Sequence, residues 1–140
     1  MDIKRQLLEV KNASRSLLAM SDKTISEVLC AVADEAVAQA DAILDANKQD
    51  LDRMDPANPK YDRLKLTLER IQGIAADMRN VAHLPSPVGR VLRDTVRPNG
   101  LKIRQVSVPF GVIGIIYEAR PNVSFDVFSL CLRSHNACVL

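Results

Sequence analysis

The sequence predicts an α/β fold in which amino-terminal helices precede a long β-hairpin and a strand–helix–strand unit. Apolar residues recur at steps of three and four over residues 3–82, and the pattern changes to short runs of strand type after residue 88. Near the carboxyl end, the apolar runs 112–116 and 137–140 flank a segment of helical pattern. Such a unit favours two parallel strands joined by a right-handed crossover.

Composition narrows the class of protein. The 140 residues are 47% hydrophobic, as expected for a globular domain with its own core. Their formal charge of +2 is too small to indicate a nucleic-acid surface. No apolar run reaches the roughly 20 residues of a membrane span, and the start "MDIKRQ" lacks the apolar core of a signal peptide. We therefore expect a cytoplasmic protein that binds neither nucleic acid nor membranes.

The cysteines and histidines do not indicate a metal site or a nucleophile. Cys30, Cys131 and Cys138 form no Cys-x-x-Cys pair, so we expect buried thiols and neither a disulfide framework nor a zinc site. His83 and His135 follow helical segments and have no Asp, Ser or Cys partner placed by sequence. We interpret both histidines as surface or capping residues.

Three helices are expected before the strands. The first covers about residues 3–20, and Ser21 then offers a capping hydroxyl to a long second helix that ends near "DLDRMDPANP". The third is marked by a stripe that runs from Leu64 to Ala82, and "HLPSPVG" ends it because proline lacks a backbone donor.

A hairpin is expected over residues 89–108. The turn "RPNG" separates two strand-like runs, and Asn99-Gly100 tolerates the positive φ angles of a tight turn. Leu101 and Ile103 alternate with basic residues, so we expect one apolar face and one polar face, the latter toward water or another subunit.

The last third reads as the start of a parallel sheet. "FGVIGII" is apolar on both sides, as in an interior strand, Pro121 suits the first turn of the helix "NVSFDVFSLCLRS", and "ACVL" has the composition of a second buried strand. Two strands and one helix cannot cover both faces of a sheet. We expect the front part of a larger protein; the alternative is a small three-helix unit with a short sheet.

The corner "YEARPN" is the candidate site, because ligands of open α/β sheets bind beyond the carboxyl ends of the strands. Asn122 offers an amide to a developing oxyanion, Arg120 suits a carboxylate or phosphate, and Glu118 would orient Arg120 or contact a sugar hydroxyl. In the alternative, Asn122 caps the helix and Arg120 is a solvated charge paired with Glu118. No phosphate loop accompanies the corner.

These residues also carry a resemblance. "VPFGVIGIIYEARPNVSFD", "SHNACVL", "DANKQDLD", "YDRLKLTLERI" and "LPSPVGRVL" with "RPNGLKIRQVSVP" resemble glutamate-5-semialdehyde dehydrogenase, or gamma-glutamyl phosphate reductase, of the aldehyde dehydrogenase superfamily. The likeness covers nearly the whole chain, and "GVIGIIYEARPNV" is its most specific element.

The resemblance implies an aldehyde-dehydrogenase-like Rossmann domain and NADPH-dependent reduction of glutamate 5-phosphate to the semialdehyde in proline biosynthesis. It assigns Asn122 to the oxyanion and places "YEAR" along the cofactor and substrate cleft, where we expect Tyr117 and Glu118 to contact the cofactor and Arg120 the substrate. Residues 1–140 would then be the amino-terminal part of the dinucleotide-binding domain, and hairpin 89–108 would belong to the oligomerisation element of a homo-oligomer. No metal is implied.

Two departures limit the expected activity. Relatives usually have Gly-Asn where this chain has His135-Asn136. The family's catalytic cysteine comes far later than residue 140, so we expect no turnover from these residues alone. The alternatives are a non-catalytic interaction module or decayed copy that associates with a full-length subunit, and another acyl-phosphate or aldehyde reductase that shares the corner.

Overall fold

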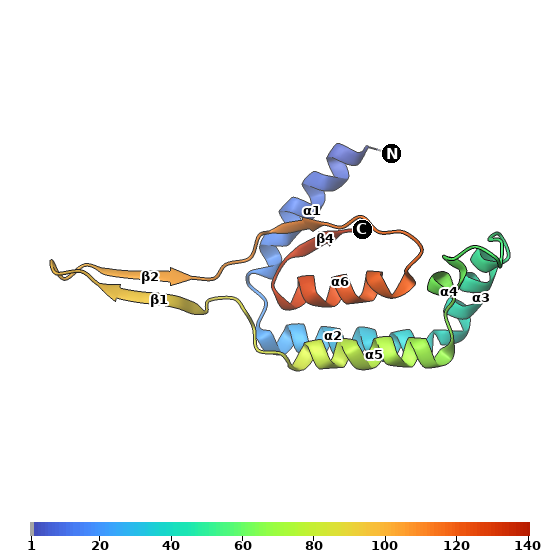
Figure 1. Cartoon of the computed structure of the whole chain (residues 1–140). Coiled ribbons are helices and arrows are strands. Elements are labelled where there is room, and N and C mark those ends of the chain that lie inside the picture. Colours follow the sequence, from blue (N-terminus) through green and yellow to red (C-terminus); the bar gives the residue numbers. More distant parts are fainter. Residues whose placement is uncertain (1) are drawn as a thin grey trace.

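The computed structural model describes residues 2–140 and confirms the predicted α/β class (Figure 1). Its helices are α1 Ile3–Leu17, α2 Asp22–Ala38, α3 Ala40–Leu51, α4 Tyr61–Leu64, α5 Leu68–His83 and α6 Pro121–Arg133. Its strands are β1 Val91–Val96, β2 Lys102–Val106, β3 Val112–Gly114 and β4 Ala137–Val139. The strands form two separate pairs, β1 with β2 and β3 with β4.

The core lies where α2, α5 and α6 stack on one another (Figure 1). Leu29 of α2 is fully buried, and Ala33 packs with Ala75 and Met78 of α5. Phe128 of α6 packs against both halves of this core. Burial of a side chain such as Leu29 stabilises a fold by about 1.5–3 kcal/mol, so these three helices are the stable part of the chain.

The second helix is shorter than the sequence predicts. Ser21 caps α2 as expected, accepting a hydrogen bond from the Thr24 amide at 3.1 Å. The helix then ends at Ala38, with Gln39 as its C-cap, and α3 starts at Ala40 in a new direction (Figure 1). The prediction of one long helix was wrong. No signal in the sequence marks the break, because the apolar stripe continues across it through the buried residues Ala36 and Ala40.

The third helix starts later than predicted. Thr67 accepts a hydrogen bond from the Arg70 amide at 3.1 Å and caps α5, whereas Leu64 ends the separate short helix α4. Buried Asn47 of α3 holds the segment between these helices. Its side chain donates to the Leu64 carbonyl and accepts from the Leu66 amide, both at 2.8 Å.

The hairpin prediction is confirmed. β1 and β2 pair antiparallel, and Gly100 takes a φ of +83° in the turn. The hairpin was expected to have one apolar and one polar face. In the structure both faces are exposed, because Leu101 and Ile103 are exposed as well as the basic residues. The hairpin projects from the helices, so none of them covers it (Figure 1).

The strand–helix–strand unit is also confirmed. β3 and β4 pair in parallel, from Val112 opposite Ala137 to Gly114 opposite Val139, and α6 is the crossover with Pro121 in its first turn. The prediction of an interior strand was wrong for this chain. β3 has only three residues, and Phe110 and Ile116 beside it are almost entirely exposed, because β4 is its single neighbour within residues 2–140.

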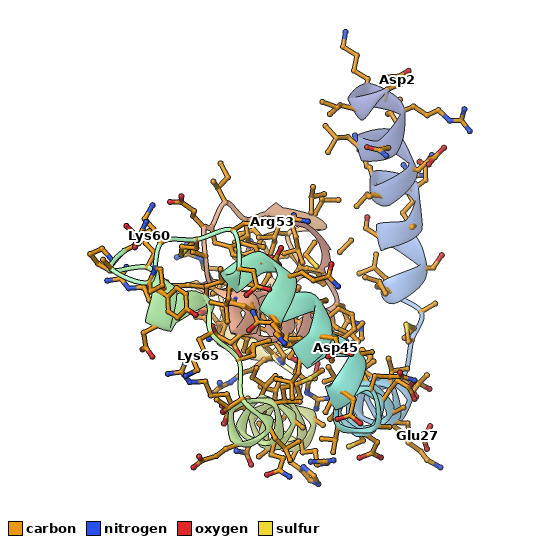
Figure 2. All side chains as sticks on the ribbon, turned by 90° about the vertical axis from the view of Figure 1, so that its right-hand side faces the viewer. Asp2, Glu27, Asp45, Arg53, Lys60 and Lys65 are labelled. Carbon is orange, nitrogen blue, oxygen red and sulfur yellow. The ribbon has the colours of Figure 1, made fainter. Side chains whose placement is uncertain are left out.

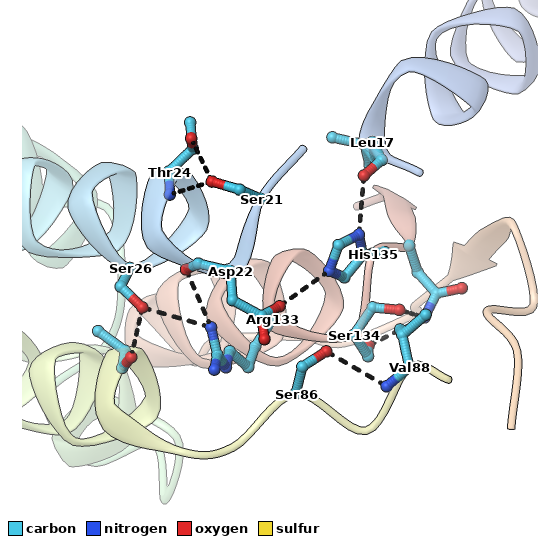
Figure 3. Close-up of polar contacts among 12 residues, drawn as sticks. Leu17, Ser21, Asp22, Thr24, Ser26, Ser86, Val88, Arg133, Ser134 and His135 are labelled. Carbon is cyan, nitrogen blue, oxygen red and sulfur yellow. Dashed lines mark hydrogen bonds and ion pairs between the residues drawn. The ribbon is translucent and has the colours of Figure 1, made fainter. Parts of the chain in front are cut away.

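The two histidines differ from each other. His83 is exposed, as expected. His135 is buried, so its interpretation as a surface residue was wrong, but the capping alternative is confirmed, because His135 follows the C-cap Ser134 and its amide donates to the Leu132 carbonyl. A left-handed φ of +56° turns His135 inward, where Nδ1 lies 2.8 Å from the Leu17 carbonyl oxygen and Nε2 lies 3.5 Å from an Asp22 carboxylate oxygen. Arg133 of α6 reaches the same cluster through Ser26 of α2 at 3.3 Å. Together His135 and Arg133 join the adjoining ends of α1, α2 and α6 (Figure 3).

Candidate functional site

A groove of about 410 Å³ opens between the segment that precedes α5, the first half of α5 and the start of α6. This volume falls within the range of small-molecule sites in proteins. Six of its lining side chains are charged: Arg63, Lys65, Arg70, Arg120, Asp62 and Asp77. Leu66 and Ile74 add apolar surface. The groove therefore combines an apolar wall with an excess of positive charge.

Two of the predicted site residues, Arg120 and Asn122, line this groove. Tyr117 and Glu118 of the same corner do not. Between the two pairs the chain turns at Ala119, whose φ of +51° is uncommon for a residue with a side chain. The turn gives the corner two separate environments.

Asn122 lines the groove and keeps one donor of its side-chain amide free. It lies in the first turn of α6 but does not cap the helix, because the capping position is Arg120 and no side chain bonds there. Its amide nitrogen donates to a carboxylate oxygen of Asp126 at 3.2 Å, on the same helix. A primary amide carries two N–H groups, so the second remains available to a ligand. The alternative in which Asn122 caps the helix was therefore wrong.

Glu118 pairs with Lys60, not with Arg120. The Lys60 ammonium donates to a Glu118 carboxylate oxygen at 2.7 Å and joins the segment before α4 to the corner. This hydrogen bond, and then the charge of Lys60, lowers the pKa of Glu118 from its ordinary value of 4.5. Tyr117 bonds through its hydroxyl to Ser124 of α6. Both contacts hold the corner against its neighbours.

Arg70 is committed to the structure of the groove wall. Its guanidinium donates to both carboxylate oxygens of Asp62, at 3.2 and 3.3 Å, and to the carbonyl oxygens of Asp62 at 2.7 Å and Lys65 at 2.5 Å. These bonds fix the bend between α4 and α5, on which Figure 2 shows Lys65. Arg70 and Asp62 thus neutralise each other.

The other charged groups of the groove are unpaired. Within residues 2–140, Arg63, Lys65 and Arg120 make no ion pair, and the Asp77 carboxylate makes neither an ion pair nor a hydrogen bond. We call Arg63, Lys65 and Arg120 the groove cations. Three cations and one carboxylate are therefore free to meet a ligand.

The contribution of residues 62–77 was missed by reasoning from the sequence, which interpreted the stripe from Leu64 to Ala82 only as a helix. The available signal was Thr67, a capping residue directly before an apolar-periodic run. Interpreting Thr67 as a helix start would have placed Lys65 in a bend before α5.

A nucleophile and a metal set are not found at the groove. None of its lining residues is a cysteine, and burial, followed by the neighbouring Cys138, raises the pKa of the Cys131 thiol. Residues 2–140 contain no cluster of His, Cys, Asp or Glu able to hold a metal ion. Across the same residues, no helix is both long and apolar enough for a membrane span. The groove can bind and polarise a ligand but holds no thiolate.

Known proteins similar to this chain include several gamma-glutamyl phosphate reductases. The gamma-glutamyl phosphate reductase of Bacteroides thetaiotaomicron is 68% identical over 131 residues, which are 94% of this chain and 31% of that protein. The one of Parabacteroides distasonis is 61% identical over 140 residues, 100% of this chain and 34% of that protein. The chain thus spans about a third of the length of the curated relatives it matches. It matches no protein-family model.

Solved structures agree with this likeness. The crystal structure of gamma-glutamyl phosphate reductase from Thermotoga maritima superimposes with a TM-score of 0.90 at 31% identity, over 99% of this chain and 34% of that one. The enzyme from Saccharomyces cerevisiae gives 0.89 at 31% identity, over 99% and 36%. The chain is thus a homologue of the amino-terminal part of these reductases.

Proposed function

We propose that this chain is the amino-terminal part of a gamma-glutamyl phosphate reductase. The reaction is the NADPH-dependent reduction of L-glutamate 5-phosphate to L-glutamate 5-semialdehyde and phosphate, in proline biosynthesis in the cytoplasm. The identity to the Parabacteroides distasonis reductase along the whole chain is the observation that carries the proposal. The basic groove beside "YEARPN" supports it, because the substrate carries negative charge.

Asn122 is proposed as the donor to the oxyanion. Reduction of an acyl phosphate through a thioester places negative charge on the reacting carbonyl oxygen, and an oriented N–H group stabilises that charge. The bond to Asp126 uses one N–H of the amide and leaves the second one without a partner, on a residue that lines the groove. Arg120 lines the same groove and is proposed to bind the phosphate or carboxylate of the substrate, which suits its planar fork of donors.

Tyr117 and Glu118 are proposed to contact the cofactor, which supplies the hydride when bound. They follow β3, which pairs in parallel with β4, and dinucleotides bind beyond the carboxyl ends of such strands. The Glu118 carboxylate is exposed and suits a ribose hydroxyl, and Lys60 beside it suits a phosphate. These residues fit a phosphorylated dinucleotide.

Residues 1–140 alone are proposed to be inactive. Cys131 is buried with a raised pKa, and neither Cys30 nor Cys138 lines the groove. Without a thiolate that faces the substrate carbonyl, the covalent step has no nucleophile. In the enzyme this chain would form part of the dinucleotide-binding domain, and hairpin 89–108 would take part in a homo-oligomer.

A chimera tests the proposal. Residues 1–140 are joined to the remaining two thirds of the Bacteroides thetaiotaomicron reductase, and NADPH formation from glutamate semialdehyde and phosphate is measured. We expect turnover from the chimera and none from the 140-residue chain. Asn122→Ala should lower kcat by about 10²–10³, whereas Asn80→Ala on the exposed side of α5 should leave it unchanged. An inactive but folded chimera would contradict the proposal.

A second candidate function is a non-catalytic module that binds a full-length subunit through its hairpin. The exposed apolar side chains of β1 and β2, among them Leu92 and Ile103, favour it. Co-purification with the Bacteroides thetaiotaomicron reductase, lost on removal of residues 90–106, would support the module. An active chimera would favour the enzyme.

A further inference from the structure

We propose that the groove recognises the α-amino-acid end of its ligand, with Asp77 binding the ammonium group and the groove cations binding the α-carboxylate. Asp77 is thereby assigned as a specificity-determining residue. The identity of the ligand as a glutamyl compound rests on the proposed function. The mixed charge of the groove is independent of it.

The cations set the first requirement on a ligand. Arg63 and Lys65 come from the segment before α5, and Arg120 comes from the start of α6, so positive charge lies on two separate walls. None of the three has an acidic partner within residues 2–140, although ion pairs occur on most other elements. Like charges held together without a counter-ion favour an anionic ligand group.

Asp77 sets the second requirement. It lies on α5 two turns beyond Arg70, and its carboxylate has no partner in the described chain. Arg70 cannot serve it, because that guanidinium is taken by Asp62 and by two carbonyl oxygens. A carboxylate in a basic groove repels phosphate and attracts an ammonium group. The groove is thus complementary to a ligand that carries both charges.

The apolar lining of the groove sets the third requirement on a ligand. Ile74 is buried except for 8% of its surface, and Leu66 is half-buried beside it. Gly73 lies between the charged residues of α5 and adds no side chain to the space. An aliphatic stretch between two polar ends fits such a wall. A glutamyl compound has this pattern: ammonium and carboxylate at one end, methylene groups, and the reacting carbonyl at the other.

The test measures binding, not turnover, on the 140-residue chain itself. Backbone amide signals of residues 63–77 and 120–122 are followed by NMR during titration with L-glutamate, glutarate or inorganic phosphate. Glutarate has both carboxylates but no ammonium group, and phosphate is an anion alone. We expect L-glutamate to shift the groove signals and to bind up to about fivefold more tightly than glutarate, the size of one exposed ion pair.

Variants separate the two charges. Asp77→Asn should lower the affinity for L-glutamate and raise that for glutarate, because residue 77 then neither attracts an ammonium group nor repels an anion; the preference for L-glutamate should disappear. Lys65→Met should weaken both ligands by a similar factor. Asp45→Asn, an exposed carboxylate on α3 outside the groove, is the matched control and should change neither. Circular dichroism confirms that each variant is folded.

Several results would overturn the proposal: equal binding of L-glutamate and glutarate by the unmodified chain, tighter binding of phosphate than of L-glutamate, no shift at the groove with any ligand, or an Asp77→Asn variant with unchanged selectivity. The chimera keeps this outcome distinct from that of the proposed function. If the chimera turns over but the chain does not prefer L-glutamate to glutarate, only the inference about Asp77 fails. If the chain shows that preference but the folded chimera is inactive, only the reductase proposal fails.

Discussion

At the scale of single residues, the ion pair between Lys60 and Glu118 makes the clearest prediction. Lys60→Met should raise the pKa of Glu118 back toward its ordinary value of 4.5, because both causes of the lowered pKa come from Lys60. The side-chain carboxyl signal of Glu118, followed by ¹³C NMR against pH, measures this shift. Lys102→Met on the hairpin is the control and should not move it.

The same pair has a defined pH dependence. Since the folded pKa of Glu118 lies below the unfolded one, its contribution to stability is present above pH 4.5 and is lost as the pH falls through the lowered pKa. Glu118 is fully exposed, so the effect on overall stability is small. A Glu118 carboxyl that titrates identically with and without Lys60 would show that the pair does not form in solution.

Cys131 provides a second test at this scale. Burial raises its pKa and keeps the thiol both protonated and covered, so it should react with iodoacetamide more slowly than Cys30 or Cys138, which are half-buried. Mass spectrometry of partly alkylated protein at pH 8 gives the order. In urea the difference should vanish. If Cys131 were modified first in the folded chain, the thiol would be reactive and the case against it as a nucleophile would fail.

At the scale of elements, Asn47 holds the bend that carries Lys65. Asn47→Ala removes two hydrogen bonds at once and leaves the Leu64 carbonyl and the Leu66 amide without their partner. We expect the free energy of unfolding to fall by about 1–3 kcal/mol, measured by urea denaturation. Asn80→Ala, on the exposed side of α5, should stay within about 0.5 kcal/mol of the unmodified chain. Equal effects of the two variants would contradict this account of the bend.

The elements also show what the sequence can and cannot reveal. Local chemistry predicted the cap at Ser21, the turn at Gly100 and the start of α6 at Pro121, because each depends on one residue's own backbone or side chain. The break at Gln39 could not be predicted, since neither proline nor glycine marks it and small apolar residues continue on both sides. The spacing of apolar residues shows which face of a helix is buried. It does not show whether one helix continues or two separate helices follow each other.

The candidate site divides in the same way. The position of Arg120 and Asn122 beside a groove followed from the strand-to-helix corner. The opposite wall did not, because Asp77 and Lys65 reach the groove through the packing of α5 beside α6, which no short motif encodes. His135 was missed for a related reason: its burial depends on the end of α1, 118 residues away in the chain.

At the scale of the whole molecule, burial is concentrated in the stacked helices. The hairpin projects from one side of the core, and α1 leads away from the same core toward the amino terminus (Figure 1). Large apolar side chains of both elements stay exposed, including Ile3, Leu8, Leu92 and Val96. Exposed apolar surface of this extent is typical of association sites rather than of a free monomer.

The hairpin should therefore mediate self-association. Leu92 and Val96 of β1 are each more than half exposed. Replacing both by serine should weaken association by at least about tenfold, since burial of one such side chain contributes about 1.5–3 kcal/mol. Sedimentation velocity over a range of concentrations measures the strength of association. The melting temperature of dilute protein should not change, because neither side chain packs in the core.

Leu130→Ser, which replaces an equally exposed leucine on α6, is the control and should leave association intact. If the unmodified chain stays monomeric, or if Leu130→Ser has the same effect as the pair, the association site does not lie on the hairpin.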